Sequence, residues 1–438
     1  MNRILRYGRG SVAVDLPEQN CRAVLEPSLP PPIGHLDEAV TRCLDDPVGG
    51  RPLSKIVEGR RRIVVAIPDM TRGEAMQAYL PPLLRYLESH RVRRENTILV
   101  TATGAHRRHT DAERAALVGA EIARQWTIAD HDADDGNNEI EPLDGDTPLW
   151  IDRRALDADG LILAGQISYH YSAGFGGGRK LVAPGLCGRA TIQALHRRTL
   201  ANIDRAGNWR GRTGALRGNP FHEAAQAACD RVGPHFALHV TLDLEGAVIG
   251  VVAGDVAKSH LAACLQYDKM FRLPIAEPLP LVVASCGGGP FDINLYQAHK
   301  ALDNAFRAVR PGGTLVLLAE CAEGWGPASF VKWLAIESLE EHRARLEADF
   351  EVPGHTTYAL KWKATQCRVI VASRTLAQAV TGGEGPAWLA DEGRAAAPFR
   401  LEFVADPSEA VARADPARAL PYCLLPAAAS CLPEITGQ

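Results

Sequence analysis

The side chains in this sequence with the clearest chemical potential are one lysine and two histidines that lie close together along the chain. Lys180 follows His170 by ten residues and precedes His196 by sixteen. A lysine amine can form a covalent bond to a carbonyl group, and an imidazole can move protons or bind a metal near neutral pH. The segment before the lysine, Gly174-Phe-Gly-Gly-Gly-Arg-Lys180, lets a ligand approach the main chain. The stretch therefore predicts a binding or catalytic site.

Two common glycine-rich motifs do not explain this stretch. A phosphate-binding P-loop ends in Gly-Lys-Ser/Thr, whereas here Arg179 precedes the lysine and Leu181 follows it. A dinucleotide-binding fingerprint places its glycines directly after a strand. Here the first glycine of the cluster comes nine positions after Gly165, where the expected strand ends. Both motifs are excluded.

Four polar side chains are expected just after strands, which is where α/β proteins bind their ligands. Asp69 and Arg72 follow one apolar run, His106 follows the next and His170 follows the third. Taken singly, Asp69 and Arg72 would suit a helix cap or a local ion pair, and His106 an exposed loop, since His109 lies nearby in a similar setting. Their shared position at strand ends favours a common site.

A second group of polar side chains occurs in the C-terminal half. An apolar run leads into the glycines at 287–289 and then into an expected helix, with Asp292 at its cap position. Tyr296, Gln297 and Lys300 can face the same way on that helix because Lys300 is four and three positions after the other two. The alternative is that these three side chains form an ordinary solvated helix face. A glycine-rich turn at the end of a strand precedes them, however, as it does in the first site, and this favours a site.

Composition limits the class of protein. Of 438 residues, 46% are hydrophobic and 23% charged, and the net charge of -4 gives no reason to expect nucleic acid or a membrane surface as a partner. No apolar run reaches the length of a membrane span or a signal peptide. The ten cysteines include no Cys-x-x-Cys pair, which favours buried thiols in a reducing cytoplasm. We expect a soluble cytoplasmic protein.

The alternation of strands and helices predicts an α/β protein with mainly parallel sheets flanked by helices. The length calls for two domains, and the proline-rich segment 272–280 is typical of a boundary. We expect an N-terminal domain over 1–271, a C-terminal domain over 281–415 and an active site in the cleft between them. Packing of the tail, 416–438, against the N-terminal domain is left open. Strands are expected at 11–16, 62–67, 97–101, 161–164, 236–241, 247–253, 281–285, 314–319, 367–372 and 399–404, and helices at 36–44, 74–90, 111–118, 255–267, 293–309, 328–334, 339–349 and 355–363.

With these motifs assembled, the chain resembles the nickel-pincer lactate racemase family, the LarA-like 2-hydroxyacid racemases and epimerases. The motifs occur in the family's order over most of the chain, and the spacing of His170, Lys180 and His196 is their most specific part. The matching motifs are Asp69-x-x-Arg72, Gly104-x-His106-Arg107, His170 with Gly174-x-Gly-Gly-Gly-Arg-Lys180, His196, and Tyr296-Gln297-x-x-Lys300.

The resemblance implies a cofactor and a role for each matching residue. The cofactor is a nickel-pincer nucleotide, pyridinium-3-thioamide-5-thiocarboxylic acid mononucleotide with nickel, attached covalently at Lys180, and His196 is the protein ligand of the nickel. His106 and His170 match the catalytic acid/base histidines. The substrate-binding positions are Arg72 and Lys300, which hold a carboxylate, with Tyr296 and Gln297. The further cofactor-binding positions are Asp69, Gly176, Gly177 and Gly178.

The implied reaction is racemisation or epimerisation of a 2-hydroxy acid, lactate-like or larger. A C–H bond next to a hydroxyl is a poor acid, so the implied route is hydride transfer to the pincer nucleotide through a flat 2-keto acid, with a histidine taking the hydroxyl proton. Two histidines serve the two placements of the hydroxyl. An arginine offers a planar two-point grip on the carboxylate.

Two other functions remain open from the residues alone. Lys180 suits an enzyme that forms a Schiff base with a carbonyl substrate. A non-catalytic binder of the nucleotide, or a chaperone in its synthesis, would keep the fold without needing the two histidines.

The sequence leaves the particular 2-hydroxy acid open. The segment 353–358 offers no tryptophan to match the aromatic residue near the substrate of the lactate enzyme, and 324–327 is another candidate pocket wall. Transient contact with cofactor-biosynthesis enzymes is implied by the resemblance. Whether the protein forms a homo-oligomer is also left open.

Overall fold

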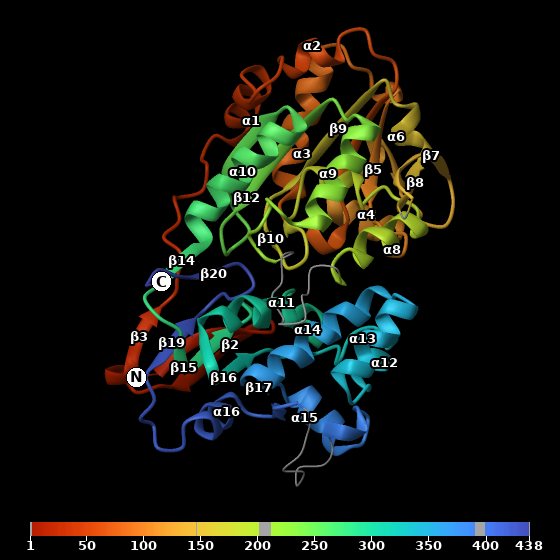
Figure 1. Cartoon of the computed structure of the whole chain (residues 1–438). Helices are drawn as coiled ribbons and strands as arrows, with labels where there is room; N and C mark the ends of the chain where they lie inside the picture. Colours follow the sequence, from red (N-terminus) through yellow and green to blue (C-terminus); the bar gives the residue numbers. More distant parts are fainter. Residues whose placement is uncertain (1, 146, 201–211, 390–398, 438) are drawn as a thin grey trace. The chain divides into compact units, whose positions relative to one another are not determined.

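The computed structural model describes residues 2–145, 147–200, 212–389 and 399–437, which form two compact units. Unit 1 comprises 1–28 and 270–438, and unit 2 comprises 29–269. Each unit has a six-stranded, mainly parallel sheet flanked by helices (Figure 1). This confirms the α/β class predicted from the alternation of elements.

The sheet of unit 2 has the strand order β13-β12-β9-β4-β5-β6. Its neighbouring strands are parallel except for the antiparallel pair β12 and β13. The strands of unit 2 are β4 (Ile63–Pro68), β5 (Thr97–Ala102), β6 (Thr127–Asp130), β7 (Asn137–Asp144), β8 (Thr147–Asp152), β9 (Gly160–Gln166), β10 (Tyr169–His170), β11 (Gly174–Phe175), β12 (Phe236–Leu242) and β13 (Val248–Gly254). Its helices are α1 (Leu36–Asp45), α2 (Leu53–Val57), α3 (Met76–Ser89), α4 (Asp111–Val118), α5 (Ala120–Gln125), α6 (Arg153–Asp157), α7 (Arg179–Val182), α8 (Arg189–Arg197), α9 (Pro220–Val232) and α10 (Val256–Phe271).

Strand β4 lies at the centre of unit 2 and is buried on both faces. Ile63, Val65 and Ile67 pack with α1 and α3, whereas Val64 and Ala66 pack with α7, α8 and α9. A strand covered on both sides needs apolar residues at every position, because successive side chains point to opposite faces. The uninterrupted apolar run in the sequence therefore predicted this strand correctly.

The sheet of unit 1 has the strand order β18-β17-β16-β15-β19-β3, with all neighbours parallel. The strands of unit 1 are β1 (Asn2–Tyr7), β2 (Gly10–Asp15), β3 (Cys21–Val24), β14 (Arg272–Ile275), β15 (Leu279–Ser285), β16 (Val309–Leu318), β17 (Arg368–Ala372), β18 (Leu401–Val404), β19 (Tyr422–Leu425) and β20 (Leu432–Ile435). Its helices are α11 (Leu295–Ala305), α12 (Ala328–Leu334), α13 (Leu339–Ala348), α14 (Val352–Gln366), α15 (Arg374–Thr381) and α16 (Pro407–Ala414).

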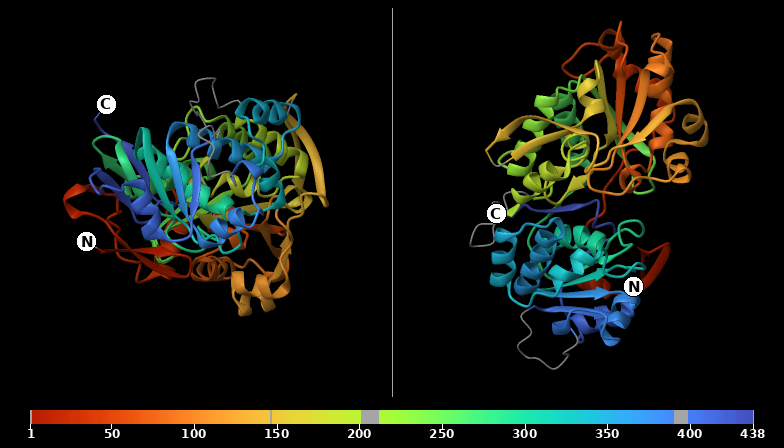
Figure 2. Two further views of the ribbon diagram at one scale, coloured as in Figure 1. Left: turned by 90° about the horizontal axis from the view of Figure 1, so that it is seen from below. Right: turned by 90° about the vertical axis from the view of Figure 1, so that its right-hand side faces the viewer.

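The expected domain limits need two corrections, both at the chain ends. Residues 1–28 belong with the C-terminal half, because β3 pairs with β19 and the β1–β2 hairpin packs Leu5 and Val14 onto the sheet of unit 1. The tail is part of the same sheet, since β19 lies between β15 and β3. In the left view of Figure 2 the red N-terminal strands lie beside the blue C-terminal part of the chain. Four consecutive buried residues, Tyr422–Leu425, make the tail a core strand rather than a surface segment.

Two further observations concern the whole described chain. Among the described residues, no helix is long and apolar enough to cross a membrane. All ten cysteines carry free thiols, and eight of them are buried. A thiol in an apolar interior behaves as a small hydrophobic side chain.

The position of β19 makes a testable prediction. Leu425 is fully buried in the core of unit 1, so Leu425→Ala should lower the free energy of unfolding of unit 1 by about 2–5 kcal/mol. Peptide-resolved hydrogen exchange in mild denaturant would locate the loss. Ile4→Ala, at a side chain that is 75% exposed on the same unit, is the control and should cost less than about 0.5 kcal/mol. A loss confined to α3 of unit 2 would contradict the assignment.

Candidate active site

The polar side chains expected at strand ends lie at one edge of the unit 2 sheet. Strands β9, β4 and β5 are parallel neighbours, so their carboxyl ends meet at that edge. Asp69 comes directly after β4, His106 comes four residues after β5, and His170 comes four residues after β9. This is the part of an open α/β sheet at which ligands bind. The shared strand-end position predicted from the sequence is confirmed.

An Asp69–His106 pair links the loops after β4 and β5. Nδ1 of His106 contacts Oδ2 of Asp69, and Oδ1 accepts bonds from the amide (3.1 Å) and the hydroxyl (2.6 Å) of Thr71. Asp69 is buried, while the His106 side chain is 51% exposed. A carboxylate only accepts hydrogen bonds, so the proton of the neutral imidazole lies on Nδ1 and the lone pair on Nε2. This tautomer is the one that a general base needs at Nε2.

The Asp69 carboxylate remains ionised across the working pH range. Burial alone would raise the pKa of Asp69, but the hydrogen bond from His106, the charge of Arg72 and the bond from Thr71 outweigh burial and lower this pKa to about 2. The Arg72 side chain is partly exposed, and its Nη1 donates to Thr71 Oγ1 at 3.2 Å. The negative charge that orients His106 is therefore permanent.

A second histidine, His109, supports this turn from inside the protein. It is buried, unlike the neighbouring His106, and its Nδ1 contacts Oδ1 of Asp130 at 2.8 Å. Its Nε2 accepts the amide of Met70 at 3.3 Å. The ring thus ties the turn at 70–72 to the end of β6. The sequence did not distinguish His106 from His109, because both lie in the loop after the same strand and no neighbouring residue shows which of them is buried.

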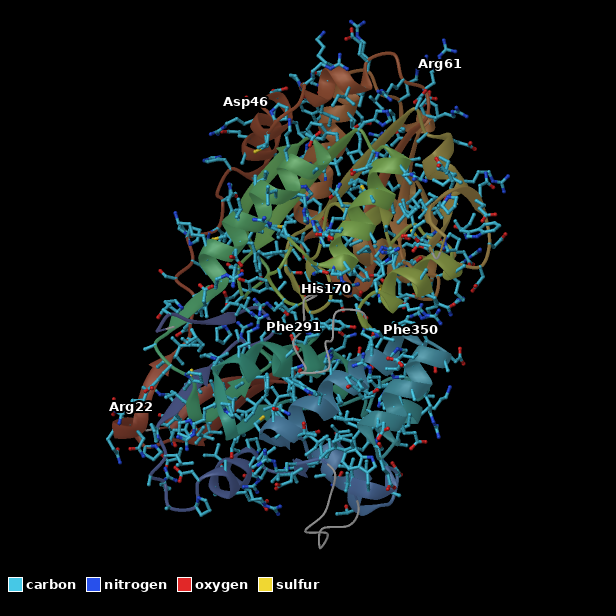
Figure 3. All side chains as sticks on the ribbon, in the orientation of Figure 1. Arg22, Asp46, Arg61, His170, Phe291 and Phe350 are labelled. Atoms are coloured by element: carbon cyan, nitrogen blue, oxygen red, sulfur yellow. The ribbon has the colours of Figure 1, made fainter. Side chains whose placement is uncertain are left out.

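His170 sits in the opposite hydrogen-bonding environment. It lies on the short β10–β11 hairpin, at the lower end of unit 2 in the view of Figure 3. Its Nδ1 accepts the amides of Ser172 (3.2 Å) and Ala173 (3.1 Å). Since Nδ1 carries the lone pair, the proton of the neutral ring lies on Nε2. His106 and His170 are therefore held as opposite tautomers.

The glycines before Lys180 have a steric reason to be glycine. Gly177 and Gly178 have φ angles of +68° and +51°. A Cβ atom on Gly177 would lie 2.7 Å from the carbonyl oxygen of Gln166, and one on Gly178 would lie 2.6 Å from Cδ2 of His260. Both positions exclude other residues. The loop is shaped by close backbone packing, and the expected cofactor contacts of Gly176, Gly177 and Gly178 stay a prediction.

The His196 imidazole is held in a form that can ligate a metal. Its Nδ1 contacts the carbonyl oxygen of Ile192 at 2.7 Å, so Nδ1 donates and Nε2 carries the lone pair. Burial, with smaller effects of the charges of Lys180 and Arg72, lowers the pKa of His196 to about 4 despite the bond to Ile192. The ring is neutral at ordinary pH. No group of three or more His, Cys, Asp or Glu side chains among the described residues could hold a metal ion by itself.

One residue that the sequence analysis missed brings three site residues together. The ring of Phe221, fully buried at the start of α9, lies 5.6 Å from Nζ of Lys180. Its centroid is 5.0 Å from that of the His196 ring and 6.4 Å from that of the His170 ring. Asn219, the helix cap beside it, donates to the carbonyl of Ser172 in the His170 turn. The only sequence signal was Asn219-Pro220, which is typical of a helix start.

Unit 1 contains the remaining predicted residues, all on α11. Nζ of Lys300 donates to Oε1 of Gln297 at 2.5 Å, which confirms that these two side chains share a face. Tyr296 packs against Phe330, with ring centroids 5.6 Å apart. Asn294 caps the helix by accepting the amide of Gln297, so the expected cap role of Asp292 is wrong. Asp292 instead accepts the amide of Gly8 at 2.7 Å.

The two candidate pocket walls of unit 1 are largely interior. Trp325 packs against Phe403, with ring centroids 5.1 Å apart at 80°. Residues 354–358 lie inside α14 and are buried, with the His355 ring stacked on that of Phe350. These aromatic side chains contribute to the core.

Comparisons with known proteins establish the family. Residues 7–207 match the model of the lactate racemase N-terminal domain, and residues 276–382 match that of the lactate racemase C-terminal domain. The lactate racemases of Thermoanaerobacterium thermosaccharolyticum and Lactiplantibacillus plantarum are each 32% identical to this chain, over 75% of it and 76% of their own length. The chain therefore belongs to the lactate racemase family and is an enzyme of the racemase class.

Solved structures agree at the level of the fold. The lactate racemase apoprotein of T. thermosaccharolyticum superimposes with a TM-score of 0.86 at 25% identity, covering 99% of this chain and 100% of that one. A protein of Thermotoga maritima reaches a TM-score of 0.66 at 16% identity, covering 91% and 98%, which supports the fold alone.

The low pKa of Asp69 makes a prediction about stability. A carboxyl whose pKa lies at about 2 in the folded chain and near 3.8 in the unfolded one stabilises the fold above pH 4, and this contribution disappears as the pH falls towards 2. Asp69→Asn should therefore lower the free energy of unfolding by about 2 kcal/mol at pH 6 and much less near pH 2. Urea unfolding at several pH values measures this, with Asn at the exposed Asp157 as the control. Equal losses at pH 6 and pH 2 would argue against an ionised Asp69 as the source of this stability.

Proposed function

We propose that this protein racemises or epimerises a 2-hydroxy acid, with lactate as the first candidate because two relatives bear the name lactate racemase. The observation that carries the proposal is the pair of histidines at one sheet edge, His106 and His170, whose Nδ1 atoms meet an acceptor and two donors, respectively. A reaction that removes a hydroxyl proton on one side and returns it on the other needs both an acceptor and a donor.

The residues of unit 2 fit the nickel-pincer nucleotide. His196 presents a neutral imidazole whose Nδ1 bonds a backbone carbonyl, which is the usual second interaction of a metal-bound histidine. Lys180 shares the Phe221 ring with His196, so an amine for covalent attachment and a nickel ligand lie in one place. We propose that Lys180 carries the nucleotide through a thioamide and that His196 binds its nickel. When bound, the nucleotide supplies the hydride acceptor and donor for C2, so that the substrate passes through a planar 2-keto acid.

The protein's own groups bind the substrate and move its proton. Nε2 of His106 accepts the hydroxyl proton, and the permanent charge of Asp69 stabilises the resulting imidazolium. When the substrate's C2 oxygen lies on the other side, Nε2–H of His170 donates a proton to it. Arg72 and Lys300 are the proposed carboxylate ligands, because a guanidinium grips two oxygens and an ammonium adds a second charge. Tyr296 and Gln297 are proposed supporting residues, and the bond from Lys300 to Gln297 supports this.

We propose a location in the reducing cytoplasm because all ten cysteines carry free thiols, and disulfides are rare in that compartment. The proposed partners are a small 2-hydroxy acid and, transiently, the enzymes that make the cofactor.

Replacement of the histidines tests this function. The enzyme is produced with the cofactor-making enzymes, L-lactate is added, and D-lactate is measured by chiral chromatography. His106→Asn and His170→Asn should each lower kcat by about 10²- to 10⁴-fold, because each removes one proton carrier. His90→Asn, at an exposed histidine after α3, is the control and should leave kcat unchanged.

Two outcomes would count against the proposal. Full racemisation by both histidine variants would remove the assigned roles. Failure with lactate and with a panel of larger 2-hydroxy acids, combined with borohydride trapping of a carbonyl substrate on Lys180, would favour a Schiff-base enzyme instead.

A further inference from the structure

Arg179 precedes Lys180 in the chain, but its side chain is completely buried. Its Nη2 donates to the carbonyl oxygens of Ala173 (2.8 Å) and Phe175 (3.3 Å), and its Nη1 lies 2.7 Å from Nε2 of His260. In the part of the chain that the structure describes, the guanidinium forms no ion pair with a carboxylate. The thiols of Cys264 and Cys229 near it give no counter-charge, because burial raises the pKa of both and keeps them protonated. A buried cation without a counter-charge is costly, so neutral acceptors must hold it.

The far end of the Arg179 side chain meets His260, on α10, which is one of these neutral acceptors. A guanidinium only donates, so Nε2 of His260 must carry its lone pair and Nδ1 its proton. Sγ of Cys264 lies beside the ring, 3.4 Å from Nε2 and 3.7 Å from Nδ1. Burial and the charge of Arg179 hold the pKa of His260 well below its ordinary value, which keeps the ring neutral. Nε2 also lies 3.0 Å from the carbonyl oxygen of Gly176, but two acceptors face each other there, so in this tautomer the contact is not a hydrogen bond.

The two side chains contact both segments that carry proposed catalytic groups. The His260 ring packs so closely on Gly178 that a Cβ there would lie 2.6 Å from its Cδ2. Arg179 holds the carbonyl of Ala173, and the amide of the same residue is one of the two donors to Nδ1 of His170. One buried pair thus touches the loop before Lys180 and the hairpin of His170.

We propose that His260 and Arg179 are positioning residues: they fix the His170 hairpin, and with it the tautomer of His170, against the loop that carries Lys180. The proposal rests on the proposed function for the roles of His170 and Lys180. Neither residue touches the substrate; both act through the backbone they hold. A guanidinium suits this task because its planar fork donates in several directions at once.

Two matched variants of His260 test the proposal in the full chain. His260→Gln keeps an acceptor for Nη1 of Arg179, whereas His260→Leu fills similar space without one. Amide hydrogen exchange is compared between a peptide covering 168–181 and one covering α3. In the Leu variant the 168–181 amides should exchange about 10-fold faster, with α3 unchanged, and kcat for lactate should fall about 10-fold with little change in KM. In the Gln variant, both the exchange at 168–181 and kcat should stay close to the wild-type values.

Several results would overturn the proposal. These are unchanged exchange at 168–181 in the Leu variant, faster exchange in α3 to the same extent, a normal kcat despite the faster exchange, or no rescue by Gln. If His260→Leu does not fold, His260→Asn, which is too short to reach Arg179, takes its place. Absence of racemisation by the wild-type enzyme would defeat the proposed function, and the exchange comparison would still decide whether the pair holds the hairpin.

Discussion

The contact of one phenyl ring with an ammonium and two imidazoles underlies the proposed site. Lys180, His170 and His196 come from three different segments, and each meets the buried ring of Phe221. A phenyl ring attracts a cation and packs against an imidazole without donating or accepting a conventional hydrogen bond. It therefore gathers the three groups while leaving their polar atoms to other partners. A polar residue in its place would compete for the protons on which the proposed chemistry depends.

The histidines of unit 2 show how one residue type is given different properties by its surroundings. A carboxylate on Nδ1 prepares His106 to accept a proton at Nε2, whereas two amides on Nδ1 of His170 leave a proton on its Nε2. A backbone carbonyl on Nδ1 of His196 leaves a lone pair for a metal. His109 and His260 are buried behind these residues. His109 accepts a hydrogen bond from the amide of Met70, and His260 accepts one from Arg179, and each bond fixes a loop. The proton position in each ring follows from the group that its neighbour presents.

The strand ends and the side chains after them could be predicted because their signals are local. The apolar run before Asp69 marks a strand buried on both faces, and a polar residue directly after it marks the ligand edge. Phe221 and His260 carried no such signal, since a phenylalanine in a helix and a histidine in a helix are ordinary until folding brings their neighbours to them. Strand β19 was missed for a similar reason: its partners, β3 and β15, are far away in sequence. The cap of α11 was predicted two residues too early, at Asp292 instead of Asn294, because both residue types are good helix caps.

The central claim, that Lys180 carries the nucleotide, is tested most directly by mass spectrometry of the denatured chain. The protein is produced together with the cofactor-making enzymes, its intact mass is measured, and peptides around Lys180 are mapped. We predict a nucleotide adduct on the peptide containing Lys180, together with nickel in the native protein, and neither adduct nor racemisation in Lys180→Ala. An unmodified chain, under conditions in which a related lactate racemase acquires its adduct, would contradict the account.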